Sequence, residues 1–345
     1  MGVSGGYQAA RRGRVIRPGG VDRALDMVMP LLRKVTAKDE TERRCTGRYG
    51  MGGSGHYVKM IHNGIEHGMM SAQSEAWQIM NLFLGMRYDE IRDEFARWNV
   101  DGEPRGTFLV DIGAPINKQR DGKGKHVLSV VEDKVVQNID GTEGTGVWSS
   151  LEAIRLHVPA PTLSDAHNVR IASALRKDRE KIKGTFGGHF PIKEWTGSAE
   201  EKKIFLEDFR KAVYAAFLTA FVQATNLIDQ ADQEKKRSIN FAEVIQIWRN
   251  GCIIRADYIA DMLESIFTKT GEHDRDLLHN HIIAKELKEN FAALKKVVTM
   301  GLDTNAIVPS LSATLEYLKY SVNTVLPTQF FMRLNWIILG SICLI

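Results

Sequence analysis

The stretch Gly55-His-Tyr-Val-Lys59-Met-Ile-His62-Asn63-Gly-Ile-Glu66-His67 decides how the rest of the chain is interpreted. A glycine-rich lead-in precedes it, and its apolar spacing predicts a helix that runs to about Leu84. One side of this helix is apolar, so we expect it to be buried with its polar stripe lining an internal cavity. The stripe has the spacing i, i+3, i+4 and i+7, which places four side chains on one face: Lys59, His62, Asn63 and Glu66.

This polar stripe combines an amine, an imidazole, an amide and a carboxyl group. These groups suffice for proton transfer and for orienting a substrate. The alternative is a solvated helix face. Such faces normally repeat long charged side chains over several turns, whereas this stripe is one compact set of different chemistries, and this difference favours a functional site.

The same stretch resembles the catalytic helix of the 6-phosphogluconate dehydrogenase family, within the β-hydroxyacid dehydrogenase superfamily. The resemblance is carried by the pattern Gly55-x-x-x-Lys59-x-x-His62-Asn63-Gly-Ile-Glu66 and extends over about residues 2 to 330. Further matches to the family follow in the expected order: Gly2–Gly6, Pro18–Gly20, Gly144-Thr-Gly146 with Trp148, Arg170, Trp248–Arg255 and Leu326–Phe330.

The resemblance implies a mainly α fold. We expect a large all-helical domain for substrate binding and dimerisation at residues 51–330. In residues 1–50 we expect a remnant of the NADP-binding, Rossmann-type α/β domain, most of which has no counterpart here. Residues 331–345 form an atypical apolar tail, since the resemblance stops after Phe330.

The segment Gly50-Met-Gly52-Gly-Ser-Gly55 satisfies the G-x-G-x-x-G pattern of dinucleotide-binding loops. No apolar strand precedes it, and the sequence after it is helical. We therefore interpret it as a turn that lets the following helix begin close to other backbone.

The rest of the chain is predicted to be almost entirely helical, with Gly2–Gly6 as a flexible loop and residues 101–147 irregular. A Ser-x-x-Glu pattern at Ser149–Glu152 predicts a helix start there. The predicted helices cover residues 21–34, 88–99, 149–157, 164–183, 200–233, 240–268, 277–300 and 310–325.

The activity implied by the resemblance is NADP-dependent oxidation and decarboxylation of 6-phosphogluconate to ribulose 5-phosphate. Lys59 matches the general base, which must be neutral although its ordinary pKa is about 10.4. Glu66 matches the acid that protonates C1 of the enediol, which requires a raised pKa. Substrate contacts are implied for eight residues: Ser4, Gly5, Gly6, His62, Asn63, His67, Thr145 and Arg170.

Three positions depart from the family pattern. His67 stands where the family has Tyr, and Val147 stands where it has Lys. Glu143 replaces a Lys that binds phosphate in the family. Because a charge reversal beside a phosphate is energetically large, Glu143 implies either a shifted loop or an altered substrate.

The charge and the cysteine content of the chain limit the classes of partner that it could bind. The net charge of +4 is small, and an excess of Lys and Arg in residues 1–50 (11 against 5 Asp and Glu) is not accompanied by a nucleic-acid motif. The cysteines Cys45, Cys252 and Cys343 lack metal spacing and fit a reducing compartment. We therefore expect a cytoplasmic protein that binds no nucleic acid, membrane or metal, and the family resemblance implies a homodimer.

Two other functions stay open from the sequence. The chain could be a truncated, non-catalytic subunit that dimerises and binds substrate only. It could also be a β-hydroxyacid dehydrogenase for a different small acid, which Glu143 supports. We expect the isolated chain to show no turnover, because hydride transfer needs a coenzyme held near the substrate.

Overall fold

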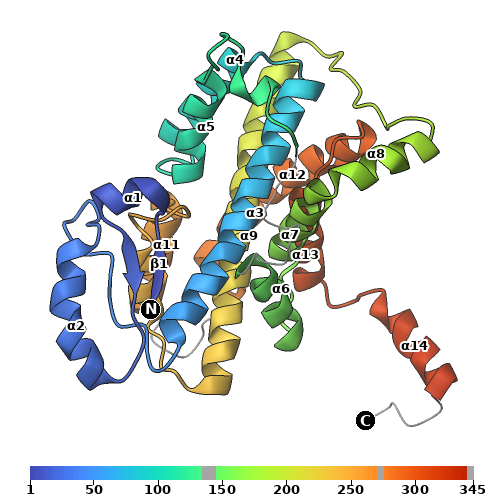
Figure 1. Ribbon diagram of the computed structural model, residues 1–345. Helices are drawn as coiled ribbons and strands as arrows, with labels where there is room; N and C mark the ends of the chain where they lie inside the picture. The colour runs from blue at the N-terminus through green and yellow to red at the C-terminus, as the bar shows by residue number, and fades with distance from the viewer. Residues whose placement is uncertain (134–144, 270–275, 340–345) are drawn as a thin grey trace.

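Two long helices run side by side through the centre of the molecule (Figure 1). The computed structural model describes residues 1–133, 145–269 and 276–339, without the side chains of residues 7, 8, 335–337 and 339. The central helices are α3 (Ser54–Gln78) and α9 (Ala199–Lys235), and α3 continues into a π-helical segment, Ile79–Phe83. This confirms the helix predicted from Gly55 to Leu84.

Helix α9 is the centre of the hydrophobic core. Every residue from Ala212 to Thr225 is buried, and small Ala and Thr side chains let neighbouring helices approach closely. Within the described part of the chain, α9 is the one helix long and apolar enough to cross a membrane. Its apolar window is 89% buried inside the protein, so packing in the core accounts for its composition.

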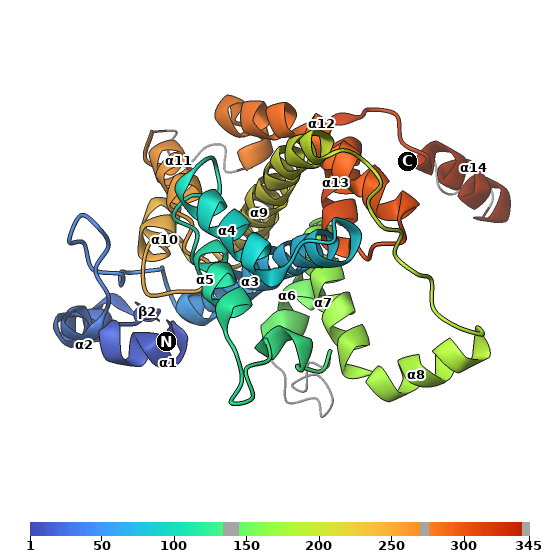
Figure 2. The same cartoon turned by 90° about the horizontal axis from the view of Figure 1, so that it is seen from above.

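The other helices surround this pair. Helices α6 and α7 pack on α3, α12 packs along α9, and α13 lies against α7 (Figures 1 and 2). This arrangement confirms the expected all-helical body. The bounds of these elements are α4 (Tyr88–Val100), α5 (Phe108–Lys118), α6 (Thr145–Arg155), α7 (Pro161–Ala174), α8 (Arg176–Thr185), α10 (Phe241–Ile247), α11 (Asp257–Lys269), α12 (His281–Asp303), α13 (Pro309–Val322) and α14 (Thr328–Leu339), with short 3-10 turns at Val127–Ser129 and Leu277–His279.

The N-terminal part is a small α/β unit beside the start of α3 (Figure 1). Its elements are β1 (Gly2–Ser4), α1 (Gly6–Arg12), β2 (Val15–Arg17) and α2 (Asp22–Val35). The strands are antiparallel, with Gly2 opposite Arg17 and Ser4 opposite Val15. The expectation of a flexible loop was therefore wrong over β1, because these three residues pair with a strand that begins eleven residues after β1 ends.

Several other predictions of local structure were also wrong. Helix α6 begins at Thr145 and not at Ser149, whose hydroxyl donates to the Gly146 carbonyl (2.8 Å) inside the helix. Helix α5 lies in the segment expected to be irregular, although it contains Pro115.

Three predicted long helices are interrupted. The helix predicted over residues 164–183 breaks at Leu175, between α7 and α8. The helix predicted over 240–268 breaks between α10 and α11, where Gly251 has a φ of +74°. The helix predicted over 277–300 begins as a 3-10 turn and continues as α12.

Helix α14 lies apart from the rest of the protein in both views (Figures 1 and 2). It exposes Phe330, Phe331, Met332, Leu334 and Ile338. The expected apolar tail thus includes most of this helix, while residues 340–345 lie outside the described part of the chain. An exposed apolar helix of this kind is typical of a surface that another protein covers.

A buried carboxylate joins α3 to α13. Glu75 accepts hydrogen bonds from the backbone N–H groups of Ser310 (2.9 Å) and Leu311 (3.0 Å), and from the Ser71 hydroxyl (2.8 Å). Those two N–H groups lie in the first turn of α13, where a helix has no internal acceptors. Burial raises the pKa of Glu75 to about 7, while the hydrogen bonds lower it.

Replacing Glu75 by Ala should therefore destabilise the protein. We expect a loss of about 3 kcal/mol in the free energy of unfolding, since the change leaves two buried N–H groups without an acceptor and removes a helix cap. The matched control is Glu316→Ala, an exposed residue of α13 that pairs with Lys319, which should cost less than about 0.5 kcal/mol. Chemical denaturation measures both, and equal losses would contradict this role of Glu75.

Candidate active site

Asn63 is the centre of a hydrogen-bonded group on α3. The Lys59 amine donates to the Asn63 side-chain oxygen (3.0 Å), and His62 Nδ1 lies 3.3 Å from the same oxygen. The Asn63 amide nitrogen donates to the Thr145 hydroxyl at the start of α6. His62 is buried, with its ring edge-on to Trp248 at 6.1 Å. The structure thus brings together four residues that were predicted from the sequence.

His67 lies one turn further along α3, against α6 and α7. Its ring stacks on His167 with 5.8 Å between ring centres and 1° between ring planes. Gly146 makes this approach possible, because a Cβ there would lie 2.2 Å from the His67 ring. His167 carried no sequence match, although its position three residues before Arg170 places both residues on one face of α7.

Glu66 and Lys59 influence each other across the stripe. Burial raises the pKa of Glu66, while the positive charges of Lys59, Arg170 and Arg17 lower it. Burial also lowers the pKa of Lys59, with Arg17 acting in the same direction and Glu66 against it. The amine is therefore moved toward its neutral form and the carboxyl toward its protonated form. A neutral Lys59 and a protonated Glu66 are the states that the family resemblance requires of a base and an acid.

Arg17 is a residue of this region that the sequence patterns did not indicate. It is fully buried in β2, and its Nη1 donates to the Ser4 hydroxyl oxygen (2.6 Å). The available signal was a single basic residue after the apolar pair Val15-Ile16 and before Pro18. Ser4 ends β1, whose Gly2 packs against the Lys59 side chain.

The two glycines after Ser4 differ in their surroundings. Gly5 has a φ of +124°, and a Cβ there would lie 2.4 Å from the Gly251 carbonyl oxygen. Gly6 has a φ of +60° and open space where a Cβ would be. Glu143, the departure from the family pattern, lies outside the described residues.

The glycine-rich segment before α3 does not form a dinucleotide cradle. A Cβ at Gly55 would lie 2.1 Å from the Arg17 carbonyl oxygen, and one at Gly50 would lie 2.2 Å from that of Arg237. Gly19 covers the first turn of α3, since a Cβ there would lie 2.7 Å from the Ser54 hydroxyl oxygen and 2.8 Å from the Gly55 nitrogen. Protein backbone thus crowds two of the three glycines of the pattern, while Gly52 faces open space. Among the described strands, the one sheet is antiparallel and has two strands, unlike a nucleotide-binding fold.

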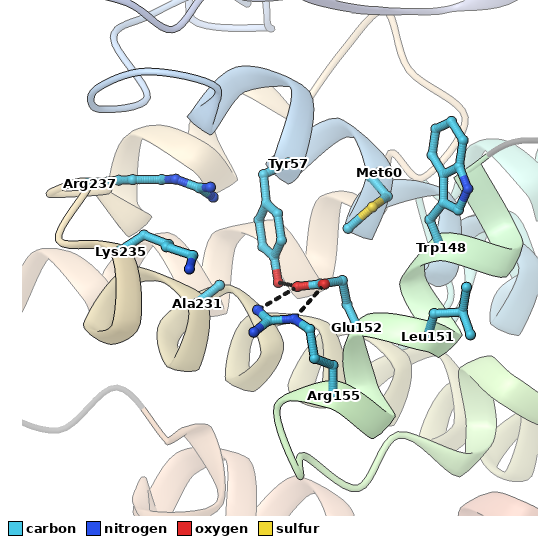
Figure 3. Close-up of a pocket in the computed structure, with 9 residues that line it drawn as sticks. All are labelled: Tyr57, Met60, Trp148, Leu151, Glu152, Arg155, Ala231, Lys235 and Arg237. Carbon is cyan, nitrogen blue, oxygen red and sulfur yellow. Dashed lines mark hydrogen bonds and ion pairs between the residues drawn. The ribbon is translucent and has the colours of Figure 1, made fainter.

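A separate groove of about 540 Å³ is lined by residues of α3, of α6 and of the end of α9 (Figure 3). Tyr57 and Met60 line it from α3, and Tyr57 donates to Glu152 (3.1 Å). Arg155 pairs with Glu152 and with Glu234. None of the residues of the polar stripe lines this groove, so we do not assign the chemistry to it.

The two histidines of the site should remain neutral through the physiological pH range. Burial, followed by Arg17 and Lys59, lowers the pKa of His62 well below its ordinary value. Burial, followed by Arg170, His167 and Lys59, lowers the pKa of His67 to about 3. Nitrogen NMR of the imidazoles, assigned with His62→Gln and His67→Gln, should show neither ring gaining a proton between pH 8 and 5. A signal that either variant removes and that titrates near pH 6.5 would contradict this environment.

Comparisons with known proteins agree on one family. The family model described as "6-phosphogluconate dehydrogenase, C-terminal domain" matches residues 55–333. The decarboxylating 6-phosphogluconate dehydrogenase of Emericella nidulans is 42% identical over 342 residues, which cover 96% of this chain and 68% of that protein. The NADP(+)-dependent, decarboxylating enzyme of Bacillus subtilis is 35% identical, with coverages of 95% and 67%.

A solved structure shows the same fold. The 6-phosphogluconate dehydrogenase of Plasmodium falciparum, described in its apo form and in complex with its cofactor NADP+ and its substrate 6-phosphogluconate, aligns with a TM-score of 0.88 and 30% identity. The alignment covers 97% of this chain and 69% of that one. This chain therefore spans about two thirds of the length of these relatives, and it belongs to the 6-phosphogluconate dehydrogenase family.

Proposed function

We propose that this chain acts in the NADP-dependent oxidative decarboxylation of 6-phosphogluconate to ribulose 5-phosphate. The observation that carries the proposal is that Lys59 and Glu66 lie on one face of α3, with the pKa of the amine lowered and that of the carboxyl raised. The names of the relatives support the substrate and the coenzyme.

Lys59 is the base in this proposal. In its neutral form it accepts the proton of the C3 hydroxyl as that carbon is oxidised. The resulting ammonium donates to the new C3 carbonyl oxygen and stabilises the negative charge that develops there when CO2 leaves C2. Asn63 accepts from the Lys59 amine and holds it on this side of the helix.

Glu66 is the acid. Loss of CO2 leaves an enediol, and a protonated carboxyl can deliver a proton to its terminal carbon. Glu66 lies seven positions after Lys59, so their Cα atoms are about 10 Å apart along the helix axis, and both long side chains can reach one substrate between them.

Cations lie toward both ends of the stripe. Arg17 lowers the pKa of Lys59 and His62 near the start of α3, and Arg170 lowers that of His67 further along; both arginines lower the pKa of Glu66. A ligand with a carboxylate at one end and a phosphate at the other matches this distribution. We propose that Ser4, Gly5 and Gly6 bind the carboxylate end, that His62 and Asn63 bind hydroxyl groups, and that the phosphate is bound by three residues: His67, Thr145 and Arg170.

NADP is the coenzyme that the relatives indicate. The described residues do not form a cradle for it, so the steps above concern only proton transfer and binding at the substrate. We also propose that residues 1–50 belong to the coenzyme-binding side of the molecule and residues 51–330 to the substrate side, since the family model first matches at residue 55.

One partial reaction tests the Lys59–Glu66 pair without coenzyme. Protonation of the enediol is reversible, so the protein should catalyse exchange of the C1 hydrogens of ribulose 5-phosphate with deuterium in D2O. In this direction the Glu66 carboxylate removes the proton, and the Lys59 ammonium polarises the ketone. We expect Lys59→Met and Glu66→Gln each to slow exchange by about 100-fold or more, as is usual for general acid–base groups. Proton NMR follows the C1 signals.

The matched controls for this experiment are Lys181→Met and Glu180→Gln, which change exposed residues of α8. They should exchange at the wild-type rate. Retention of that rate by Lys59→Met or Glu66→Gln would remove these residues from the mechanism. Failure of the wild-type chain to bind 6-phosphogluconate in calorimetry, combined with binding of a different hydroxyacid, would favour the related β-hydroxyacid dehydrogenase instead.

We further propose that the protein is a homodimer, an inference supported by the exposed apolar side chains of α14. Light scattering should give twice the mass of one chain, and the double variant Phe330→Asp, Phe331→Asp should give the mass of a monomer. The control Ile182→Asp changes an exposed apolar residue of α8 and should leave the mass unchanged. A monomeric wild-type protein would contradict the proposal.

We propose a cytoplasmic location as well. The support is that the two cysteines in the described residues, Cys45 and Cys252, are both free and buried.

A further inference from the structure

Arg17 is a cation in an unusual position. It belongs to β2, all three residues of which are buried, and its side chain has no exposed surface. Its Nη1 donates to Ser4, but its Nε and Nη2 have no hydrogen-bond partner among the described residues. Proteins rarely bury a guanidinium group without satisfying most of its donors.

The charge of Arg17 is also not balanced by an ion pair within the described part of the chain. Buried charges in proteins are normally paired, because removing an ion from water is costly. The groups near Arg17 include His62, Tyr49, the Lys59 amine and the Glu66 carboxyl, and burial moves the last two toward their uncharged forms, which leaves the charge of Arg17 in excess. A negative charge brought by a ligand would balance this local excess of positive charge.

Ser4 is the residue that accepts a hydrogen bond from Arg17. It is half-buried, whereas Arg17 is fully buried, so Ser4 lies nearer to solvent. A hydroxyl group has one donor and two acceptor positions. Because the Ser4 oxygen accepts from a cation, its own O–H is free to donate and is made a stronger donor by polarisation.

We propose that Arg17 is a positioning residue for the carboxylate end of the substrate: it fixes and polarises Ser4, whose O–H donates to that carboxylate, and its positive charge balances the negative charge. This inference rests on the proposed function. The phosphate end belongs to the region of Arg170, which acts on Glu66 and His67 and not on the residues next to Ser4. Arg17 therefore affects the binding of the carboxylate and not that of the phosphate.

The test compares two ligands that differ at one end. 6-Phosphogluconate carries both anionic groups, whereas glucitol 6-phosphate has the same carbon chain and phosphate with a CH2OH group in place of the carboxylate. Calorimetry with Arg17→Met should show a loss of about 10- to 100-fold in affinity for 6-phosphogluconate, the usual effect of losing a charge-assisted contact. The affinity for glucitol 6-phosphate should change by less than about threefold.

Three further variants test whether Arg17 affects the affinity for the ligand through Ser4. Ser4→Ala should reproduce the selective loss, and the double variant should lose little more than either single change, because the two residues act as one unit. Arg17→Lys should restore part of the affinity for 6-phosphogluconate, since it keeps the charge. The matched control Arg14→Met removes an exposed arginine of the same segment and should leave both affinities unchanged.

Thermal unfolding separates this role from a structural one. Met is long and apolar, so Arg17→Met should unfold at or above the wild-type temperature while losing carboxylate-specific affinity. Equal losses for both ligands, or no loss for either, would overturn the inference even if the wild-type protein binds 6-phosphogluconate. If Arg17→Met does not fold, Ser4→Ala decides the question with the same pair of ligands. Failure of the wild-type protein to bind 6-phosphogluconate would instead reject the proposed function and this inference together.

Discussion

The first turn of α3 lies directly against the backbone of β2, and the site depends on this contact. At Gly55 even a single methyl group would meet the Arg17 carbonyl oxygen at 2.1 Å, and at Gly2 it would meet the Lys59 side chain at 2.6 Å. The absence of side chains at these glycines lets the N-terminal strands approach the polar face of α3. This approach partly removes Lys59 from water and places Ser4 and Arg17 beside it.

Partial burial then determines the chemistry of the stripe. An exposed lysine would be protonated at neutral pH, and an exposed glutamate would be ionised. Burial shifts both equilibria toward the uncharged forms. The neighbouring cations oppose this shift for Glu66, whereas for Lys59 the charge of Glu66 opposes it and that of Arg17 adds to it. The same burial keeps His62 and His67 neutral, so they can serve as hydrogen-bonding groups without adding positive charge. The arginines, which stay charged, provide the attraction for an anionic ligand.

The parts of the fold that have a long periodic pattern could be predicted from the sequence. Helix α3 and the apolar centre of α9 were predicted because their spacing repeats over many turns. Strand β1 could not be predicted, because three residues carry no period and depend on a partner strand elsewhere in the chain. Arg17 was missed for a related reason: a basic residue in a short segment normally indicates a solvated position, and only tertiary packing buries this one. The helix start predicted at Ser149 was wrong because the Ser-x-x-Glu pattern lies inside a helix that begins four residues earlier.

The central claim is that Lys59, Glu66 and Ser4 face one bound sugar acid. A crystal structure of the protein with 6-phosphogluconate tests it most directly. We expect the Lys59 amine to lie about 3 Å from the C3 oxygen, the distance of a hydrogen bond. We also expect Glu66 beside the neighbouring carbon C2 and a hydrogen bond from the Ser4 hydroxyl to the carboxylate. A ligand bound elsewhere, or one bound here with the Lys59 amine turned away from it, would contradict the account.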